Sequence, residues 1–302
     1  RVRGIDLIVD GNTDTKLEVP LMIIDPDSTH QTLIVQAWHW GLVLGKIDLW
    51  IRDKRVVDFN MELIPINLKR IIKRPDGKKA FRFIGKPIKE DPELLALLQP
   101  YADKVDRFLD ETIGYAKAPF ENNDGRYRET ALGDLVADAM RWHLRRFNPD
   151  FALTNSGAIR GGISEGPLTR KSIYNILPFD SSVVFLKLTG DQVQALFDYI
   201  GTIQPGEGAF PQVSGGIRFT MNEEKKTCEN ILINGSPIDH GKSYGIVTNS
   251  YLAKGGDGYG AFLKTIDPFD SSTFQNDALI AYIKHLGGNL VPEVNGRITI
   301  NH

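Results

Sequence analysis

The sequence predicts an α/β fold in which helices pack with a mixed β-sheet, and two observations predict this class. Amphipathic segments of helical spacing alternate with short apolar runs of strand character from about residue 130 to the C-terminus. No fixed-period repeat and no low-complexity segment interrupts this alternation. We therefore expect an α/β domain of irregular connectivity rather than a repeat array.

The N-terminal part of the chain, up to about residue 68, has the character of β-strands. Four short runs carry it, at residues 5–9, 33–36, 46–51 and 56–63. The last two predict a hairpin that turns at residues 52–54. Residues 69–79 form a basic segment with a Pro-Asp-Gly turn signal and no aromatic side chain on which a nucleobase could stack. We interpret this segment as a solvated loop and not as a nucleic-acid patch.

A connecting helix is expected next. Asp91 is a favourable N-cap, and Pro92 is a favourable first residue of a helix. Apolar side chains then recur at helical spacing at Leu94, Leu98, Tyr101, Val105 and Phe108. The pattern predicts a helix of about four to five turns that ends near Gly114 and joins two units of the chain.

The second unit mixes helices and strands. Helical patterns cover residues 130–147, 191–200 and 277–286. Gly201 follows the second of these and can end it in the left-handed conformation. Strand-like runs cover residues 151–154, 182–188, 216–221, 244–248 and 297–300.

Composition excludes several classes of function. The chain has 302 residues, of which 41% are hydrophobic and 25% charged, which is enough to bury a core. The net charge of −2 creates no general attraction for nucleic acid or an anionic membrane. No apolar stretch reaches the roughly 20 residues of a membrane-spanning helix, and Cys228 is the one cysteine, so no internal disulfide or cysteine metal cluster forms. The chain starts at Arg1 without a leader, and we expect upstream residues to have been removed by processing or by the choice of expressed region.

Four loops of the second unit combine glycines with polar and aromatic side chains, a composition that core packing does not require. They cover residues 125–129, 155–160, 177–180 and 249–259. Each lies beside a predicted strand or helix, where ligand sites of α/β proteins gather. Each residue also has a simpler interpretation when taken alone. Residues 255–258 could be only a turn, Phe179 could fill the core, and Arg160 could pair with a surface carboxylate.

Five ordered motifs give the chain from about Arg126 onward its resemblance to the C-terminal domain of 5'-nucleotidases. The first is the helix-opening run 128–139, which begins Arg-Glu-Thr-Ala-Leu-Gly-Asp-Leu. The others are Asn155-Ser156-Gly157-Ala158-Ile159-Arg160, Leu177-Pro178-Phe179, Gln212-Val213-Ser214-Gly215-Gly216, and the run 248–259 with its Gly-Gly-Asp-Gly. A lone Gly-Gly-Asp-Gly would be a weak signal, but five motifs in order over about 175 residues are specific.

The resemblance implies a role for each matched residue. Members of the family hold the nucleobase between two aromatic rings, and the matching positions are Phe179 and Tyr251; many relatives have phenylalanine at the second. Asp257 matches a carboxylate that binds the ribose hydroxyls. Three further matches are implied to lie in the substrate pocket, Asn155 as a contact to the base and Arg126 and Arg160 as contacts to hydroxyl or phosphate oxygens. Gly215 joins this substrate-binding set through its motif.

The N-terminal part resembles only the end of the family's metallophosphatase domain. Residues 35–45 match a Gln-Ala-x-x-x-Gly-x-x-Leu-Gly segment of that domain. In the family this domain holds two divalent metal ions, such as zinc or manganese, and the catalytic residues. Asn12 and Asp14 occupy the positions of a metal-binding His motif, and neither offers an imidazole. We therefore expect no catalytic residue and no bound metal in this chain alone, and its six histidines are scattered without ligand spacing.

These observations predict three regions and a function. Residues 1–85 are the remnant of the metallophosphatase domain, 86–120 the connecting helix and hinge, and 121–302 the nucleotide-binding domain. The first hypothesis is the substrate-binding portion of a 5'-nucleotidase-type phosphohydrolase of nucleotide catabolism, which the resemblance places in the periplasm, outside the cell or on its surface. The alternative is a non-catalytic nucleoside- or nucleotide-binding protein, which Asn12 favours. A structural adhesion domain is disfavoured because it gives no reason for Phe179, Tyr251 and Asp257 to occur together.

Overall fold

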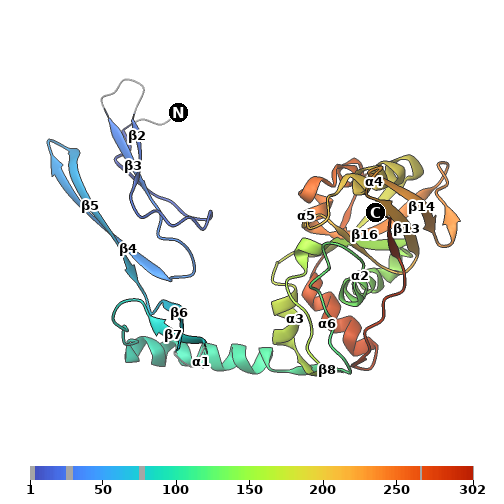
Figure 1. Cartoon of the computed structure of the whole chain (residues 1–302), viewed down its shortest axis with the longest axis horizontal. Helices are drawn as coiled ribbons and strands as arrows, with labels where there is room; N and C mark the ends of the chain where they lie inside the picture. The colour runs from blue at the N-terminus through green and yellow to red at the C-terminus, as the bar shows by residue number, and fades with distance from the viewer. Residues whose placement is uncertain (1–3, 25–29, 75–78, 266, 302) are drawn as a thin grey trace. The chain divides into compact units, whose positions relative to one another are not determined.

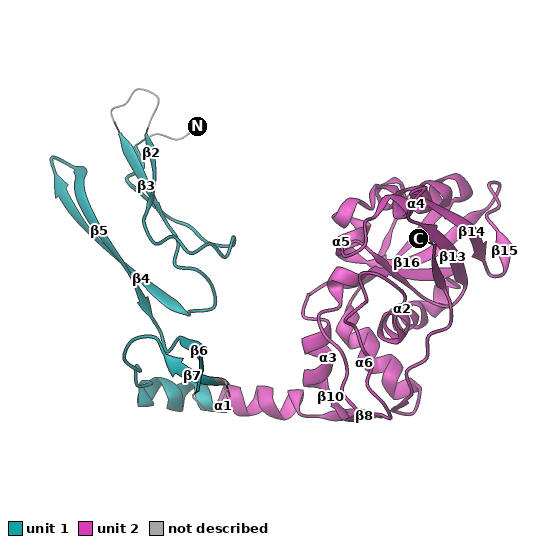
Figure 2. Ribbon diagram, viewed as in Figure 1, with its two compact units in different colours: residues 1–99 teal, residues 100–302 magenta. Residues whose placement is uncertain are grey.

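The computed structural model describes residues 4–24, 30–74, 79–265 and 267–301. The chain divides into two compact units, Arg1–Gln99 and Pro100–His302 (Figure 2). The boundary falls within helix α1 (Pro92–Leu109). No helix among the described residues is long and apolar enough to cross a membrane.

Unit 1 is built from strands up to α1. A three-stranded sheet has the order β1 (Leu7–Val9), β3 (Gln31–Val35), β2 (Leu21–Ile24), in which β1 runs parallel and β2 antiparallel to β3. The predicted hairpin is confirmed as β4 (Val43–Arg52) and β5 (Arg55–Pro65). Its two central residues, Asp53 and Lys54, have φ of 49° and 59°. Positive φ at both positions matches the right-handed twist of the strands that the turn joins.

The prediction of a solvated loop at residues 69–79 is wrong, because this segment contributes to a second hairpin. β6 (Lys69–Lys73) pairs antiparallel with β7 (Lys79–Phe83), and Ile71 lies opposite Phe81. Lys69 Nζ lies 4.9 Å from the centre of the Phe83 ring. The apolar side chains of Ile71 and Ile72 thus belong to a strand whose partner strand lies mostly after the basic segment. The residues of the basic segment alone therefore do not reveal this pairing. The Pro-Asp-Gly signal itself lies outside the described residues.

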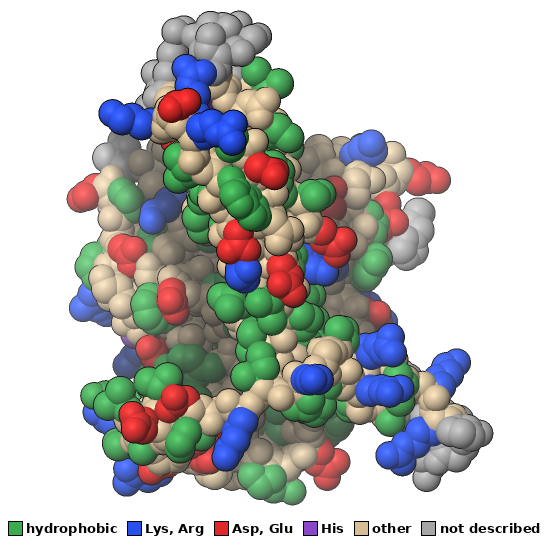
Figure 3. Space-filling model, turned by 90° about the vertical axis from the view of Figure 1, so that its left-hand side faces the viewer, with side chains coloured by type: hydrophobic (Ala, Val, Ile, Leu, Met, Phe, Trp, Pro, Cys, Tyr) green, Lys and Arg blue, Asp and Glu red, His purple; other side chains and the backbone are tan. Residues whose placement is uncertain are grey.

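Unit 1 leaves much apolar surface exposed. All four side chains of β2 are exposed, as are Trp50 and Ile51 of β4. Figure 3 shows hydrophobic side chains among charged ones on the face that it draws. Among its described residues, the buried apolar side chains are Leu33, Val35 and Val43. Exposed apolar strand faces of this kind are typical of surfaces that another segment covers.

The predicted helix after Asp91 is confirmed, but it ends earlier than expected. Asp91 Oδ1 accepts hydrogen bonds from the backbone N–H groups of Glu93 and Leu94 at 2.9 and 3.1 Å, as an N-cap does. α1 ends at Leu109 rather than near Gly114, because Thr112 begins strand β8 (Thr112–Ala116). This strand pairs with β10 (Gly166–Thr169) and β18 (Asn289–Leu290) in a three-stranded sheet of unit 2.

The centre of unit 2 is a mixed five-stranded sheet (Figure 1). Its order is β12 (Pro211–Val213), β9 (Phe151–Asn155), β16 (Ser243–Asn249), β11 (Ser182–Thr189) and β17 (Phe269–Phe274). β9 and β16 run parallel, and the other neighbours are antiparallel. A four-stranded sheet joins β15 (Ser236–Pro237), β14 (Thr227–Ile233), β13 (Ile217–Asn222) and β19 (Ile298–Asn301). The predicted mixed α/β class is confirmed.

Helices cover both faces of the central sheet. They are α2 (Ala131–His143), α3 (Arg170–Ile176), α4 (Gly190–Thr202), the short α5 (Ser250–Ala253) and α6 (Gln275–His285). One core cluster combines side chains of α2, α3 and α6, and the other those of α4. Along β9 the side chains alternate between them: Ala152 belongs to the first cluster, and Phe151 and Leu153 to the second. Every residue of β9 is buried, so the packing of its side chains fixes the position of the strand and of its last residue.

A cluster of charges is buried where α2 begins. The Arg297 guanidinium donates to both carboxyl oxygens of Asp138 at 2.8 to 2.9 Å, and the Glu129 carboxylate accepts from the backbone N–H of Asn295 and Ile298. Asp134 lies 3.3 Å from Arg297 Nε, and neither of its buried carboxyl oxygens has a hydrogen-bond partner among the described residues. Burial raises the pKa of Asp134 to about 8, although Arg297 opposes the shift, and the nearby Glu129 adds to it. One arginine cannot neutralise three carboxylates, and the raised pKa favours a proton on Asp134 at neutral pH.

The buried proton predicts how stability depends on pH. The pKa of Asp134 is about 8 in the folded chain and 3.8 at its ordinary value, so between these limits the folded state binds a proton that the unfolded state lacks. Stability therefore falls as pH rises through this window, by about 1.4 kcal/mol per pH unit for one proton. Asp134→Asn removes the titrating group, so we expect its free energy of unfolding to change less between pH 5 and 8. Urea unfolding at pH 5, 6.5 and 8 measures this slope. The exposed Asp106→Asn is the control, and a wild-type slope in Asp134→Asn would contradict the assignment.

Candidate functional site

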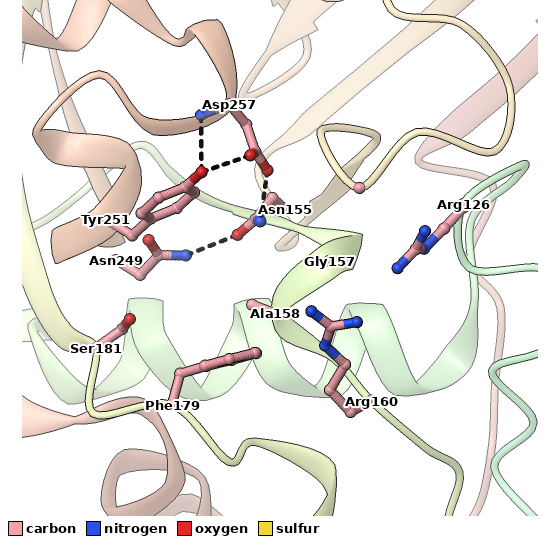
Figure 4. A pocket seen from close by; sticks show the side chains of 11 residues that line it. Arg126, Asn155, Gly157, Ala158, Arg160, Phe179, Ser181, Asn249, Tyr251 and Asp257 are labelled. Atoms are coloured by element: carbon pink, nitrogen blue, oxygen red, sulfur yellow. Dashed lines mark hydrogen bonds between the residues drawn. The ribbon is translucent and has the colours of Figure 1, made fainter. Parts of the chain in front are cut away.

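A pocket of about 330 Å³ lies in unit 2 where β9 and β16 end (Figure 4). This volume is in the range of small-molecule sites. Residues from five separate segments line it: Arg126, Asn155, Gly157, Ala158, Arg160, Phe179, Ser181, Gly208, Asn249, Tyr251 and Asp257. Six of the seven residues that the sequence placed in the substrate-binding set are therefore brought together.

The floor of the pocket is made by the last residues of the two parallel strands. β9 ends at Asn155 and β16 at Asn249, and both side chains are buried. Asn249 Nδ2 donates to Asn155 Oδ1 at 3.1 Å, while Asn249 Oδ1 accepts from the backbone N–H of Leu252 at 2.9 Å and caps α5. The carboxyl ends of neighbouring parallel strands lie at one edge of the sheet, so these amides are held side by side.

Small residues after β9 let two loops touch through their backbones. Gly157 N donates to the Gly208 carbonyl at 2.8 Å, and a Cβ on Gly157 would lie 3.0 Å from that same oxygen. A Cβ on Gly162 would lie 2.6 Å from the carbonyl oxygen of Phe120. The glycines of this loop thus make room for neighbouring backbone, and Gly157 and Gly208 themselves line the pocket.

Asp257 is the acceptor at one side of the pocket. Asn155 Nδ2 donates to its Oδ2 at 2.8 Å, and the Tyr251 hydroxyl donates to its Oδ1 at 2.7 Å (Figure 4). The hydrogen bond to Asp257 raises the pKa of Tyr251, so the hydroxyl keeps its proton and remains a donor. Asp257 belongs to the one-turn helix η3 (Gly256–Gly258), so residues 255–258 do form a turn, and the turn presents a carboxylate to the pocket.

Two aromatic rings lie on opposite sides of the pocket (Figure 4). Phe179 is 42% exposed and Tyr251 is 49% exposed. A side chain that fills a core is fully buried, so the core-filling interpretation of Phe179 is wrong. The guanidinium carbon of Arg160 lies 5.1 Å from the centre of the Phe179 ring, within the range of a cation–π contact.

Arg126 and Arg160 place positive charge at the pocket. Within the described part of the chain, neither has a salt bridge to a carboxylate, so the surface ion pair considered for Arg160 is not formed there. Arg126 Nη1 donates to the Gly206 carbonyl at 3.4 Å. Since no described carboxylate pairs with either guanidinium group, both remain available to an anion.

The loop that carries Arg126 is tied down by a buried glutamine that sequence reasoning left out of the site. Gln212 Nε2 donates to the carbonyls of Gly125 and Arg128 at 2.9 and 2.8 Å, and its Oε1 accepts from Thr130 N at 3.1 Å.

Ser181, Gly208 and Asn249 also line the pocket and were not predicted as site residues from the sequence. Asn249 and Gln212 belong to quoted motifs, but nothing in the sequence around Gly208 indicates that it approaches Gly157.

Gly215 does not line this pocket. Its N–H donates to Asp138 Oδ1, and its carbonyl accepts from Arg141 Nη1, both at 2.8 Å. The residue therefore forms a turn after β12 that contacts α2, where the charge cluster of Arg297 lies.

Asn12 and Asp14 do not form a metal centre with their neighbours. Both are exposed and have positive φ, and His39 Nδ1 lies 3.9 Å from Asp14 Oδ1. Over the described ranges, no group of three or more His, Cys, Asp or Glu side chains could hold a metal ion. The residues present thus do not fit the pair of divalent metals that the resemblance implies, and no chemical step is derived from them.

Comparison with known proteins places the chain in one family. The family described as "5'-nucleotidase, C-terminal domain" matches residues 112–264. The 5'-nucleotidase of Vibrio vulnificus is 32% identical over 268 residues, which are 84% of this chain and 47% of that protein. Protein UshA of Escherichia coli is 31% identical over 243 residues, 80% of this chain and 43% of that protein.

A solved structure shares the fold over nearly the whole chain. The crystal structure of a 5'-nucleotidase precursor from Thermus thermophilus matches with a TM-score of 0.62 and 25% identity, and covers 98% of this chain and 59% of that chain. This chain spans less than half the length of both curated relatives.

Proposed function

The chain belongs to the 5'-nucleotidase family through its C-terminal domain, and from this premise we propose that the pocket of unit 2 binds the nucleoside part of a nucleotide. One observation carries the proposal: two half-exposed rings, Phe179 and Tyr251, lie across a pocket from each other, with the Asp257 carboxylate at its side. A single exposed aromatic side chain is common on protein surfaces, but exposed rings that gather at a pocket are typical of a ligand-binding site.

The two rings suit a nucleobase. Stacking of a base on an aromatic ring contributes roughly 1–3 kcal/mol and tolerates different bases. Around the rings, the buried polar groups are the amides of Asn155 and Asn249, which hydrogen-bond to each other. Asn155 also donates to Asp257, and after these two bonds its amide keeps one N–H and one oxygen lone pair, so Asn155 can contact the edge of a base without a charge requirement. The site is therefore suited to several nucleobases.

The sugar and the phosphates have separate partners in this proposal. Asp257 accepts hydrogen bonds from the vicinal hydroxyls of a ribose, because an ionised carboxylate has about four lone-pair sites. Arg126 and Arg160 receive phosphate oxygens, for which planar guanidinium groups provide paired donors. Arg126 and Arg160 line the same pocket as Asp257 and the two rings, so one nucleotide can contact all of them through its base, sugar and phosphate.

We further propose that this chain is the substrate-binding portion of a 5'-nucleotidase-type phosphohydrolase, which releases phosphate from nucleotides with two divalent metal ions. The names of the curated relatives and the exposed apolar strands of unit 1 support this proposal. The residues of this chain would bind and orient the nucleotide, whereas the divalent metal ions would be held by residues outside this chain. Residues 86–120 are the proposed connection between the two regions. A periplasmic, secreted or cell-surface location is part of the same proposal, which the description of one structural relative as a precursor supports.

Titration calorimetry with adenosine tests the binding function. We expect the chain to bind adenosine and Phe179→Ala to weaken binding by about tenfold, because one stacking surface is lost. Phe179 is 42% exposed, so its removal should change the free energy of unfolding by about 1 kcal/mol or less. Phe81→Ala, at an exposed phenylalanine of unit 1, is the matched control. Equal affinity in wild type and Phe179→Ala would remove the stacking role.

Phosphate release separates the enzyme from a non-catalytic binder. We expect the full-length product of the gene to release phosphate from adenosine 5'-monophosphate with manganese, and residues 1–302 alone to release none. A full-length protein that binds adenosine but releases no phosphate with manganese or zinc would establish the alternative, for which Asn12 is the sequence feature in favour.

A further inference from the structure

The hydroxyl of Tyr251 contacts Asp257 at two atoms. It donates to the carboxylate Oδ1 at 2.7 Å and accepts from the backbone N–H of the same residue at 3.3 Å. The other carboxylate oxygen accepts from Asn155 Nδ2 at 2.8 Å. The orientation of this carboxylate is therefore set by two side chains, one at the end of β9 and one on α5. A phenylalanine at position 251 would supply a stacking ring but none of the contacts to Asp257.

Asp257 has a backbone conformation that needs such support. Its φ of 51° and ψ of 24° lie in the left-handed region, which is strained for a non-glycine residue. The Tyr199 hydroxyl donates to its carbonyl oxygen, so its N–H and its C=O are both held by tyrosine hydroxyls. Gly255 and Gly258 also have positive φ, of 79° and 84°, and complete the turn around Asp257.

The ring of Tyr251 is also fixed in place. A Cβ on Gly256 would lie 2.6 Å from both Cε1 and Cζ of this ring, so the ring lies directly against the glycine backbone. The hydroxyl tether to Asp257 holds its far end. One face of the ring thus contacts backbone, and the side chain lines the pocket opposite Phe179 (Figure 4).

We propose that Tyr251 is a positioning residue which couples the base-stacking ring to the sugar-binding carboxylate, so that its hydroxyl aims Asp257 at the vicinal hydroxyls of a ribonucleoside. This inference rests on the proposed function. It assigns the Tyr251 hydroxyl a role in selecting ribose that is separate from the stacking of its ring. Ribonucleotides are accordingly the preferred substrate class over nucleotides whose sugar lacks these hydroxyls.

The Tyr251 hydroxyl and the hydroxyls of a ribose can bind the Asp257 carboxylate at the same time. An ionised carboxylate has about four lone-pair sites, and Tyr251 and Asn155 occupy one on each oxygen. One site per oxygen remains, which suits two neighbouring hydroxyl groups. A carboxylate that is oriented before binding loses less conformational freedom when the sugar arrives.

Calorimetry with adenosine and 2',3'-dideoxyadenosine tests the coupling in the complete 302-residue chain. Tyr251→Phe keeps the ring and removes the hydroxyl, so we expect adenosine affinity to fall by about fivefold and dideoxyadenosine affinity to change by less than about twofold. Tyr115→Phe makes the same chemical change at an exposed tyrosine of β8 and should alter neither. A Tyr251→Phe variant that weakens both ligands equally, or neither, would overturn the coupling, because a merely structural role does not distinguish the two sugars.

A double-mutant cycle adds a second test. Asp257→Gly removes the carboxylate, and glycine adopts the left-handed conformation of this position without strain. If the hydroxyl acts through Asp257, Tyr251→Phe should have no further effect on adenosine affinity in this background, whereas a persistent loss of about fivefold would contradict the proposal. A wild-type chain that binds neither nucleoside would instead overturn the proposed function, so the two failures are distinct.

Discussion

The burial of the central strands on both faces is the constraint on which the pocket depends. β9 has no exposed residue, and its alternating side chains belong to two separate cores, so the strand cannot shift by one residue without exchanging them. Its partner β16 is buried over its last four residues. The ends of both strands are therefore fixed, and Asn155 and Asn249 meet there. From this pair, contacts of the site extend through Asp257 to Tyr251 on one side and through Gly157 to Gly208 on the other.

Much of this arrangement could be predicted from the sequence, and the failures have physical reasons. The helices near residues 130, 191 and 277 and the hairpin at residues 52–54 were predicted because period and turn chemistry are local. β17 was missed because its Asp-Ser-Ser-Thr centre has the composition of a loop, and it forms at the sheet edge by pairing with β11. β6 was taken for part of a loop because its partner lies beyond the basic run.

The site residues were likewise predicted where a local sequence motif marks them, and their contacts were missed where these depend on the folded backbone. Motifs placed Asn155, Phe179 and Asp257 in one set, and the structure brings them to one pocket. No motif could indicate that the hydroxyl of Tyr251 contacts the residue six positions later, because that contact depends on the left-handed turn at Asp257 and on the glycine beneath the ring. Gly215 shows the converse: it belongs to a motif, yet its contacts are to α2 and the buried charge cluster.

The proposed function separates recognition from chemistry, since the pocket residues would bind base, sugar and phosphate without taking part in bond cleavage. A crystal structure of the chain with adenosine tests this account most directly. We expect the base between the rings of Phe179 and Tyr251, with both ribose hydroxyls on the Asp257 carboxylate. Adenosine bound elsewhere with this pocket empty, or its ribose turned away from Asp257, would contradict it.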